Sequence, residues 1–250
     1  MKFADPFARS LHKPQDTYIF AASQLQGSRK TQEDYFTNFN DECFVVADGV
    51  GGIPNGEVAS QLACETAIWA YKLVRLRRYY WMDKRMFLKR IFRSTNIRVW
   101  QKRRESGFEQ GLATTLLVCI VGTHTYWIGN AGDSSAFVFH EDTLTKITQD
   151  DVDTQGRLTK SVGTLRYGMT PGISTGDFGI GDILLLATDG LTRYVPVPDI
   201  GEIMSHIGDT SESMTEATVE LLKKAQQYRS TDNVTACLIK RIPVPHVSIR

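Results

Sequence analysis

Strand-like segments lie on both sides of a long helical stretch, and this order limits the folds open to the chain. The strand-like runs are rich in β-branched and aromatic residues, whereas the stretch between them has apolar residues at helical spacing. We expect strands at 18–23, 41–47, 114–121, 125–130, 134–139, 144–147, 183–188 and 234–241, and helices at 56–80, from 82 onward, at 198–207 and at 212–228. Strands and helices grouped in this way predict an α+β layered sandwich.

The length of 250 residues suits one large domain, and a hydrophobic content of 42% is enough for an ordinary core. We expect a single domain at residues 17–242, between an irregular lead-in at 1–16 and a tail at 243–250. Pro243 and Pro245 are expected to end the last strand. No run approaches the ~20 apolar residues of a membrane span, and the first residues do not resemble a signal peptide.

Four cysteines occur singly inside apolar runs, at positions 43, 64, 119 and 237. None belongs to a Cys-x-x-Cys pair, so buried, reduced thiols are favoured over disulfides. Reduced thiols indicate a reducing compartment, and we therefore expect a cytoplasmic location.

The charge of the chain is unevenly distributed. Residues 72–104 contain thirteen Lys or Arg and one acid, Asp83, whereas the whole chain has a net charge of only +1. This basic segment therefore carries +12 and the remainder −11. One interpretation is a solvated helix face; the other is a docking surface for an acidic or phosphorylated protein. Nucleic acid is not expected, because no recognised reading motif is present.

Acidic residues stand where strand-like runs begin or end. Asp48 and Asp189 each follow an apolar run and precede a glycine, and Asp232 comes shortly before the last strand. Carboxylates gathered at strand ends repel one another unless a cation neutralises them. Oxygen ligands of this kind suit hard divalent metals, so the sequence predicts a metal site.

Eight segments, taken in order, resemble the metal-dependent serine/threonine protein phosphatases of type 2C. They are residues 28–34 (SRKTQED), 46–60 (VADGVGG with GEVAS), 111–115 (GLATT), 130–134 (NAGDS), 147–150 (ITQD), 158–163 (LTKSVG), 181–191 (GDILLLATDGL) and 230–235 (STDNVT). The resemblance implies a four-layer α-β-β-α sandwich, in which two antiparallel sheets are flanked by helix pairs.

The resemblance also implies two or three Mn²⁺ or Mg²⁺ ions and a role for each matching residue. Asp48 matches the ligand that bridges two ions, and Arg29 matches the guanidinium that holds the substrate phosphate. The other implied metal-site residues are Glu33 with its support Asp34, Gly49 through its carbonyl, Asp189, Asp232 and, for a weaker third ion, Asp133.

Two positions depart from the family pattern. Val50 stands where many eukaryotic relatives have a histidine, so it offers no proton to the leaving group; bacterial relatives commonly have an apolar residue there. Asp151 replaces a usual histidine, and the following stretch up to Ser161 is short. We expect a bacterial-type enzyme with a shortened flap beside the metals.

The expected activity is hydrolysis of phosphoserine and phosphothreonine in proteins, opposing a serine/threonine kinase. One alternative is a catalytically silent member that binds a partner through the same fold. Another is a two-metal phosphodiesterase on an unrelated fold, which is disfavoured because none of the five histidines lies in the matching segments.

Overall fold

The structure is a computed structural model that describes residues 17–51, 55–76 and 83–243. Some predictions concern residues outside these ranges and stay predictions. They are the lead-in at 1–16, the tail after residue 243, the part of the matching segment 46–60 at residue 52, and the end of the first helix at 77–80.

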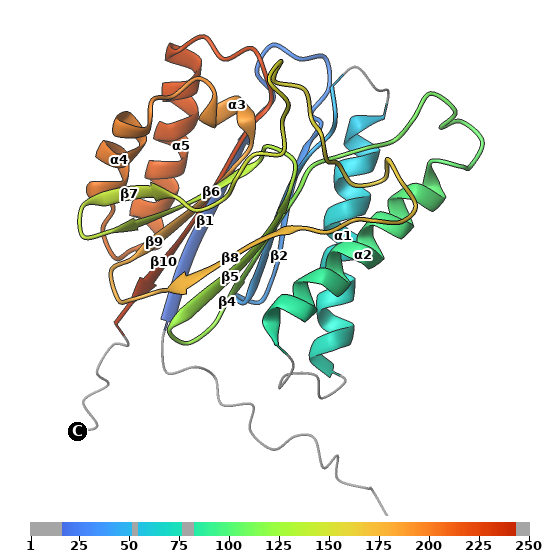
Figure 1. The fold of residues 1–250 in the computed structure, drawn as a ribbon. Coiled ribbons are helices and arrows are strands. Elements are labelled where there is room, and N and C mark those ends of the chain that lie inside the picture. Colours follow the sequence, from blue (N-terminus) through green and yellow to red (C-terminus); the bar gives the residue numbers. More distant parts are fainter. Residues whose placement is uncertain (1–16, 52–54, 77–82, 244–250) are drawn as a thin grey trace, which may run out of the picture.

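Ten strands of the described residues form two antiparallel sheets that lie face to face (Figure 1). The first sheet has the order β1 (Thr17–Leu25), β10 (Val234–Ile242), β9 (Ile183–Ala187), β6 (Ser135–His140), β7 (Thr143–Lys146). The second has the order β2 (Asp34–Phe39), β3 (Cys43–Asp48), β4 (Leu116–Val121), β5 (Thr125–Ala131), β8 (Gly172–Asp177). The two predicted antiparallel sheets are therefore confirmed.

A helix pair covers the outer face of each sheet (Figure 1). Helices α1 (Gly56–Leu76) and α2 (Lys84–Lys102) pack on the second sheet, and α4 (Val197–Ser205) and α5 (Ser211–Gln227) pack on the first. A third apolar cluster fills the space between the sheets. The short α3 (Asp189–Thr192) follows β9 directly. This arrangement confirms the four-layer α-β-β-α sandwich.

Helix α2 buries the apolar stripe that its sequence predicts. Leu88, Ile91, Phe92, Thr95 and Val99 are all buried. Their spacing of three and four residues places them on one side of the helix, so most of the basic residues point to solvent. The N-cap is Asp83, whose carboxylate accepts a hydrogen bond from the backbone N–H of residue 85.

Three elements are not predicted by the sequence pattern. Strand β2 lies between the expected strands at 18–23 and 41–47. Strand β8 has the sequence GISTGD, which contains two glycines and no apolar run, and it pairs with β5 at the edge of its sheet. Helix α3 is a single turn, too short for a periodic signal.

The four cysteines are buried and unpaired, as predicted. Among the described residues, no helix has both the length and the apolar character needed to cross a membrane.

Candidate metal centre

A pocket of about 400 Å³ opens at the end of the sandwich where β3 ends and β10 begins. It contains every predicted site residue except Asp34. Its lining consists of Arg29, Glu33, Asp48, Gly49, Val50, Gly51, Thr115, Asp133, Gly156, Arg157, Leu158, Asp189, Arg193 and Asp232. Segments up to two hundred residues apart in the chain thus meet here, and the pocket is strongly acidic.

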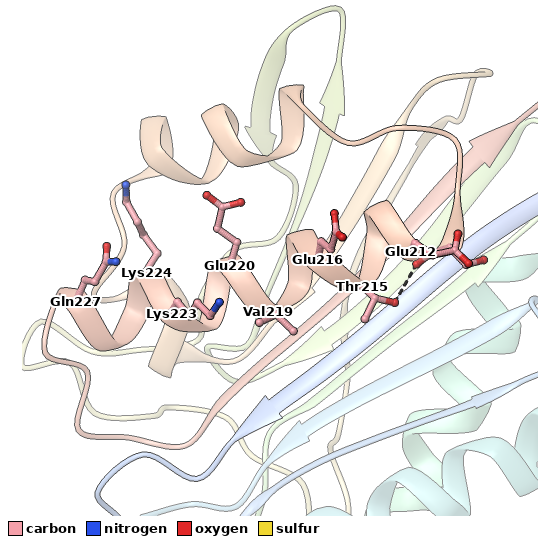
Figure 2. Close-up of a pocket in the computed structure, with 9 residues that line it drawn as sticks. Glu212, Thr215, Glu216, Val219, Glu220, Lys223, Lys224 and Gln227 are labelled. Atoms are coloured by element: carbon pink, nitrogen blue, oxygen red, sulfur yellow. Dashed lines mark hydrogen bonds between the residues drawn. The ribbon is translucent and has the colours of Figure 1, made fainter.

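A larger hollow of about 890 Å³ lies along the solvent side of α5 (Figure 2). Side chains of this one helix make up its whole lining, and Glu216, Glu220 and Lys224 recur along it at one-turn intervals. It is a groove in a solvated, charged helix surface. The predicted site residues lie in the smaller pocket of about 400 Å³.

The backbone of Asp48 is held firmly at the end of β3. Its N–H donates to the Thr115 hydroxyl at 2.9 Å, and its carbonyl accepts from the Thr115 N–H at 2.8 Å and from the Thr114 hydroxyl at 2.8 Å. Three hydrogen bonds fix the position from which the carboxylate extends into the pocket.

Glycine at positions 49 and 56 lets two backbone segments pack tightly beside Glu33. A Cβ on Gly49 would lie 2.5 Å from the backbone of Gly56, and a Cβ on Gly56 would lie 2.8 Å from a Glu33 carboxylate oxygen. Glu33 therefore lies against the first residue of α1, where the helix dipole favours negative charge. Gly56 thus serves the backbone geometry at the entry to α1.

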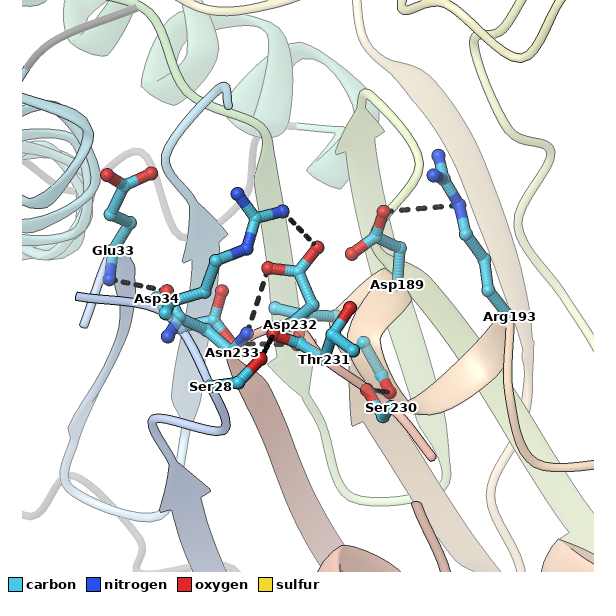
Figure 3. A network of polar contacts seen from close by, with 12 residues as sticks. Ser28, Glu33, Asp34, Asp189, Arg193, Ser230, Thr231, Asp232 and Asn233 are labelled. Atoms are coloured by element: carbon cyan, nitrogen blue, oxygen red, sulfur yellow. Dashed lines mark hydrogen bonds and ion pairs between the residues drawn. The ribbon is translucent and has the colours of Figure 1, made fainter. Parts of the chain in front are cut away.

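Asn233, in the matching segment 230–235, forms hydrogen bonds with the loop that carries Glu33 (Figure 3). Its side-chain carbonyl accepts from the Glu33 N–H at 2.8 Å, and its amide donates to the carbonyls of Gln26 at 2.7 Å and Thr31 at 3.1 Å. The neighbouring Asp232 is thereby brought beside the loop that carries Glu33. The first and the last of the eight matching segments, residues 28–34 and 230–235, are therefore joined directly by hydrogen bonds.

Two arginines bind the carboxylates of the pocket. Arg29 donates to Asp232 at 2.7 Å. Arg193 donates to Asp133 at 2.5 Å and contacts Asp189 at 3.1 Å. Figure 3 shows the contact with Asp189.

Asp34 lies behind the pocket rather than in its lining. It is almost fully buried, and one of its oxygens accepts hydrogen bonds from the hydroxyls of Thr188 at 2.8 Å and Thr235 at 2.7 Å. Asp34 is directly opposite Asp48 in the pairing of β2 with β3. The Asp34 carboxylate thus bonds Thr188 and Thr235, and its expected role as the support of Glu33 stays a prediction.

Burial and mutual repulsion make the acidic groups costly to ionise together. Burial raises the pKa of Asp48 well above its ordinary value, and the charges of Asp34 and Asp189 raise it further. Burial also raises the pKa of Glu33 and, together with the nearby Asp133, that of Asp189. A cation in the pocket would remove this penalty.

The donor set fits a hard divalent cation. It offers only oxygen, and one oxygen each of Asp34 and Asp189 is buried without a hydrogen-bond partner. No group of three or more His, Cys, Asp or Glu in the described part of the chain is already gathered at metal-binding spacing. The carboxylates of Asp232 and Asp133 are instead directed at Arg29 and Arg193.

Residues 26–238 match the family model described as protein phosphatase 2C. The chain belongs to this family. The second alternative, a phosphodiesterase on an unrelated fold, is therefore wrong, and the chain is a member of the metal-dependent protein phosphatases.

Several relatives of this phosphatase are bacterial proteins, and the matches cover most of both chains. The serine/threonine phosphatase stp of Listeria welshimeri is 26% identical over 233 residues, with 81% of this chain and 85% of that protein covered. The structure of serine/threonine phosphatase Stp1 from Staphylococcus aureus superposes with a TM-score of 0.79 at 25% identity, covering 88% and 94% of the two chains. The catalytic domain of PstP, solved with two manganese ions, gives a TM-score of 0.76 at 25% identity and covers 90% and 98%.

The flap of this phosphatase is a tight hairpin at the pocket rim. Val152 pairs with Leu158, and the Asp153 carboxylate accepts from the backbone N–H of Arg157 at 2.9 Å. Asp151, at the position where the family usually has histidine, accepts from the Gly132 N–H at 3.1 Å and binds Lys160 at 2.7 Å. Asp151 thus links the base of the flap to the turn that carries Asp133.

Sequence reasoning did not find Arg193, Asn233, Thr188 or Thr235 as site residues. Thr188 and Thr235 lie within the matching segments, but their bonds to Asp34 join residues 154 and 201 positions apart and leave no local signal. Arg193 lies just beyond the segment 181–191. Its only sequence signal is the spacing of four from Asp189, which also occurs in ordinary surface ion pairs.

Proposed function

We propose that this protein hydrolyses phosphoserine and phosphothreonine in proteins, using two Mn²⁺ or Mg²⁺ ions held in the acidic pocket. The observation that carries the proposal is the meeting of Glu33, Asp48, Asp189 and Asp232 in one pocket with an arginine at its entrance. The two manganese ions in the related PstP structure support the choice of cofactor.

In this proposal Asp48 would help to hold both ions, Asp189 and Asp232 would hold the first ion, and Glu33 with the Gly49 carbonyl would hold the second. Such ions, when bound, lower the pKa of water and polarise a phosphoryl group. Asp34 stays buried and orients the centre through its strand partner Asp48.

Arg29 is the proposed anchor of the substrate phosphate. Its guanidinium is planar, permanently charged and about half exposed, with a side-chain accessibility of 48%. On metal binding, Asp232 would turn toward the ion and release the Arg29 fork for phosphate oxygens. Val50 lines the same pocket but carries no transferable proton. The leaving alkoxide therefore takes its proton from water.

The test is release of phosphate from a phosphoserine peptide. We expect turnover with Mn²⁺ that a chelator abolishes, and little turnover of the diester bis-p-nitrophenyl phosphate. A catalytically silent protein would release no phosphate from peptide or from p-nitrophenyl phosphate at any metal concentration. The intact acidic set gives no support to that alternative.

The partner that we propose is an acidic or phosphorylated protein, the substrate of an opposing serine/threonine kinase, docked on the basic segment 72–104. Arg85, Lys89 and Arg93 of α2 are exposed and follow one another at intervals of four, so they lie along one face of the helix. A pocket lined with carboxylates does not itself attract anionic protein, and a separate basic face would supply the steering.

Charge reversal tests this docking surface. Lys89→Glu with Arg93→Glu should slow phosphoprotein turnover at low salt and leave p-nitrophenyl phosphate turnover unchanged. Lys223→Glu, at an exposed site on α5, is the matched control. Equal rates for all variants would leave this face of α2 as a solvated surface only. The cytoplasmic location stays a prediction from the reduced cysteines.

A further inference from the structure

Arg193 lies between two carboxylates of the pocket. One helical turn positions it: the Arg193 N–H donates to the Asp189 carbonyl at 2.9 Å, and its side chain returns to the Asp189 carboxylate at 3.1 Å. The same guanidinium reaches Asp133 at 2.5 Å. Asp133 comes from the turn between β5 and β6, so Arg193 joins parts of the chain that are 60 residues apart.

Asp133 needs a positive partner because of its burial. Only 7% of its side chain is accessible, whereas 52% of the Arg193 side chain is accessible. A buried carboxylate without a compensating cation is unfavourable by several kcal/mol. Burial raises the pKa of Asp133, and the charge of Arg193 is the strongest influence that lowers it again. Asp133 is the residue for which the sequence resemblance implies a weaker third ion.

We propose that Arg193 takes the place of that third ion, so that the centre holds two divalent ions and a permanent guanidinium. The inference rests on the proposed function, since it concerns the same acidic pocket. Asp133 then acts as the partner of Arg193 and not as a metal ligand.

The chemistry of arginine suits this role. Its charge does not titrate below about pH 12, and its planar fork contacts two carboxylates at once. A cation tethered on the same helical turn competes at an effective concentration of the order of millimolar or more. A third ion would have to displace it, and would then sit beside an unpaired guanidinium.

The experiment counts Mn²⁺ ions per chain by equilibrium dialysis and calorimetry. We expect two ions in the wild-type protein and in Arg157→Ala, a control arginine at the same pocket that pairs with Asp153. Arg193→Ala should gain a third ion, and Arg193→Ala combined with Asp133→Asn should return to two. Arg193→Lys keeps the charge and should bind at most two, which covers the case in which the alanine variant does not fold.

Three outcomes overturn the inference. One is a wild-type protein that binds three ions and loses one with Asp133→Asn. Another is a folded Arg193→Ala protein that still binds two. In the third, Arg193→Ala raises the KM for p-nitrophenyl phosphate while the number of Mn²⁺ ions per chain stays the same. That result would mean that Arg193 binds substrate. A different result, in which the wild-type protein binds no Mn²⁺, would contradict the proposed function itself. The experiment therefore separates failure of the inference from failure of the proposed function.

Discussion

Asp34 and Asp48 occupy directly opposite positions in the antiparallel pair of β2 and β3. Residues opposite each other in such a pair have Cβ atoms about 4.5–5.5 Å apart, so the two carboxylates lie on one face of the sheet. Only one of them lines the pocket. Asp48 is thus placed to meet a ligand, while Asp34 is placed behind it with threonine hydroxyls as its partners.

Asp48→Asn should abolish turnover and leave the fold intact. The amide is a poor bridging ligand, and its loss of charge relieves repulsion among Asp34, Asp48 and Asp189. We expect a thermal midpoint in the presence of chelator that equals or exceeds that of the wild type. Asp177→Asn, at the exposed end of β8, is the control. Activity above about a tenth of wild type, a loss of only about 1.4 kcal/mol in transition-state stabilisation, would contradict the role of Asp48.

Arg29→Ala should raise KM for p-nitrophenyl phosphate by about tenfold or more, because a charged fork that holds phosphate is lost. The affinity for Mn²⁺, measured by calorimetry, should change much less. Lys30→Ala tests whether removal of any charge in this exposed loop has the same effect. If Mn²⁺ affinity falls as much as KM rises, Arg29 acts through Asp232 and does not hold substrate.

Thr188→Val should lower the free energy of unfolding by about 1–3 kcal/mol, as measured by urea denaturation of the chelated protein. The substitution keeps the shape of the side chain but removes one of two hydroxyl donors to the buried Asp34 carboxylate. Thr192→Val, one turn along the chain at a half-buried position, should change stability by less than about 0.5 kcal/mol. Equal effects of the two valines would show that the hydroxyl bond to Asp34 contributes nothing specific.

The pair His140–Asp182 should stabilise the protein only on the acidic side of neutrality. The ring of His140 lies 2.6 Å from the Asp182 carboxylate, and this hydrogen bond raises the pKa of His140 above its ordinary value of about 6.5. Because the folded state binds the proton more tightly, the stabilisation is present below pH 6.5 and disappears as pH rises through the raised pKa.

We therefore expect His140→Ala to lower the thermal midpoint more at pH 5.5 than at pH 8.5. His124→Ala, at an exposed turn between β4 and β5, is the control. A deficit that is the same at both pH values would mean that His140 acts by packing and not by charge.

Most of the helices and strands, and the acidic residues that meet in the pocket, could be predicted because they have local signals. Apolar runs mark β9 and β10, and the stripe from Leu88 to Val99 marks α2. Strand β8 could not be predicted, since its glycine-containing sequence becomes a strand only by pairing with β5.

The internal partners of the site also escaped prediction. Asn233 contacts Glu33 across 200 residues, and Asp34 meets Thr235 across 201. Such pairings depend on sheet register, which no local pattern specifies. Arg193 escaped for a different reason: an exposed arginine one turn after an aspartate is ordinary until the turn at Asp133 is brought beside it.

The position of β10 has a consequence for the synthesis of the protein. This strand lies between β1 and β9, and the residues just before it are Asp232 and Asn233. Chains are synthesised from the N-terminus, so β1 has no strand partner until residues 234–242 have been made. The pocket therefore assembles last. Under the proposed function, a chain that stops before Asp232 lacks one of the proposed metal ligands, and we expect it to be inactive even if its other layers fold.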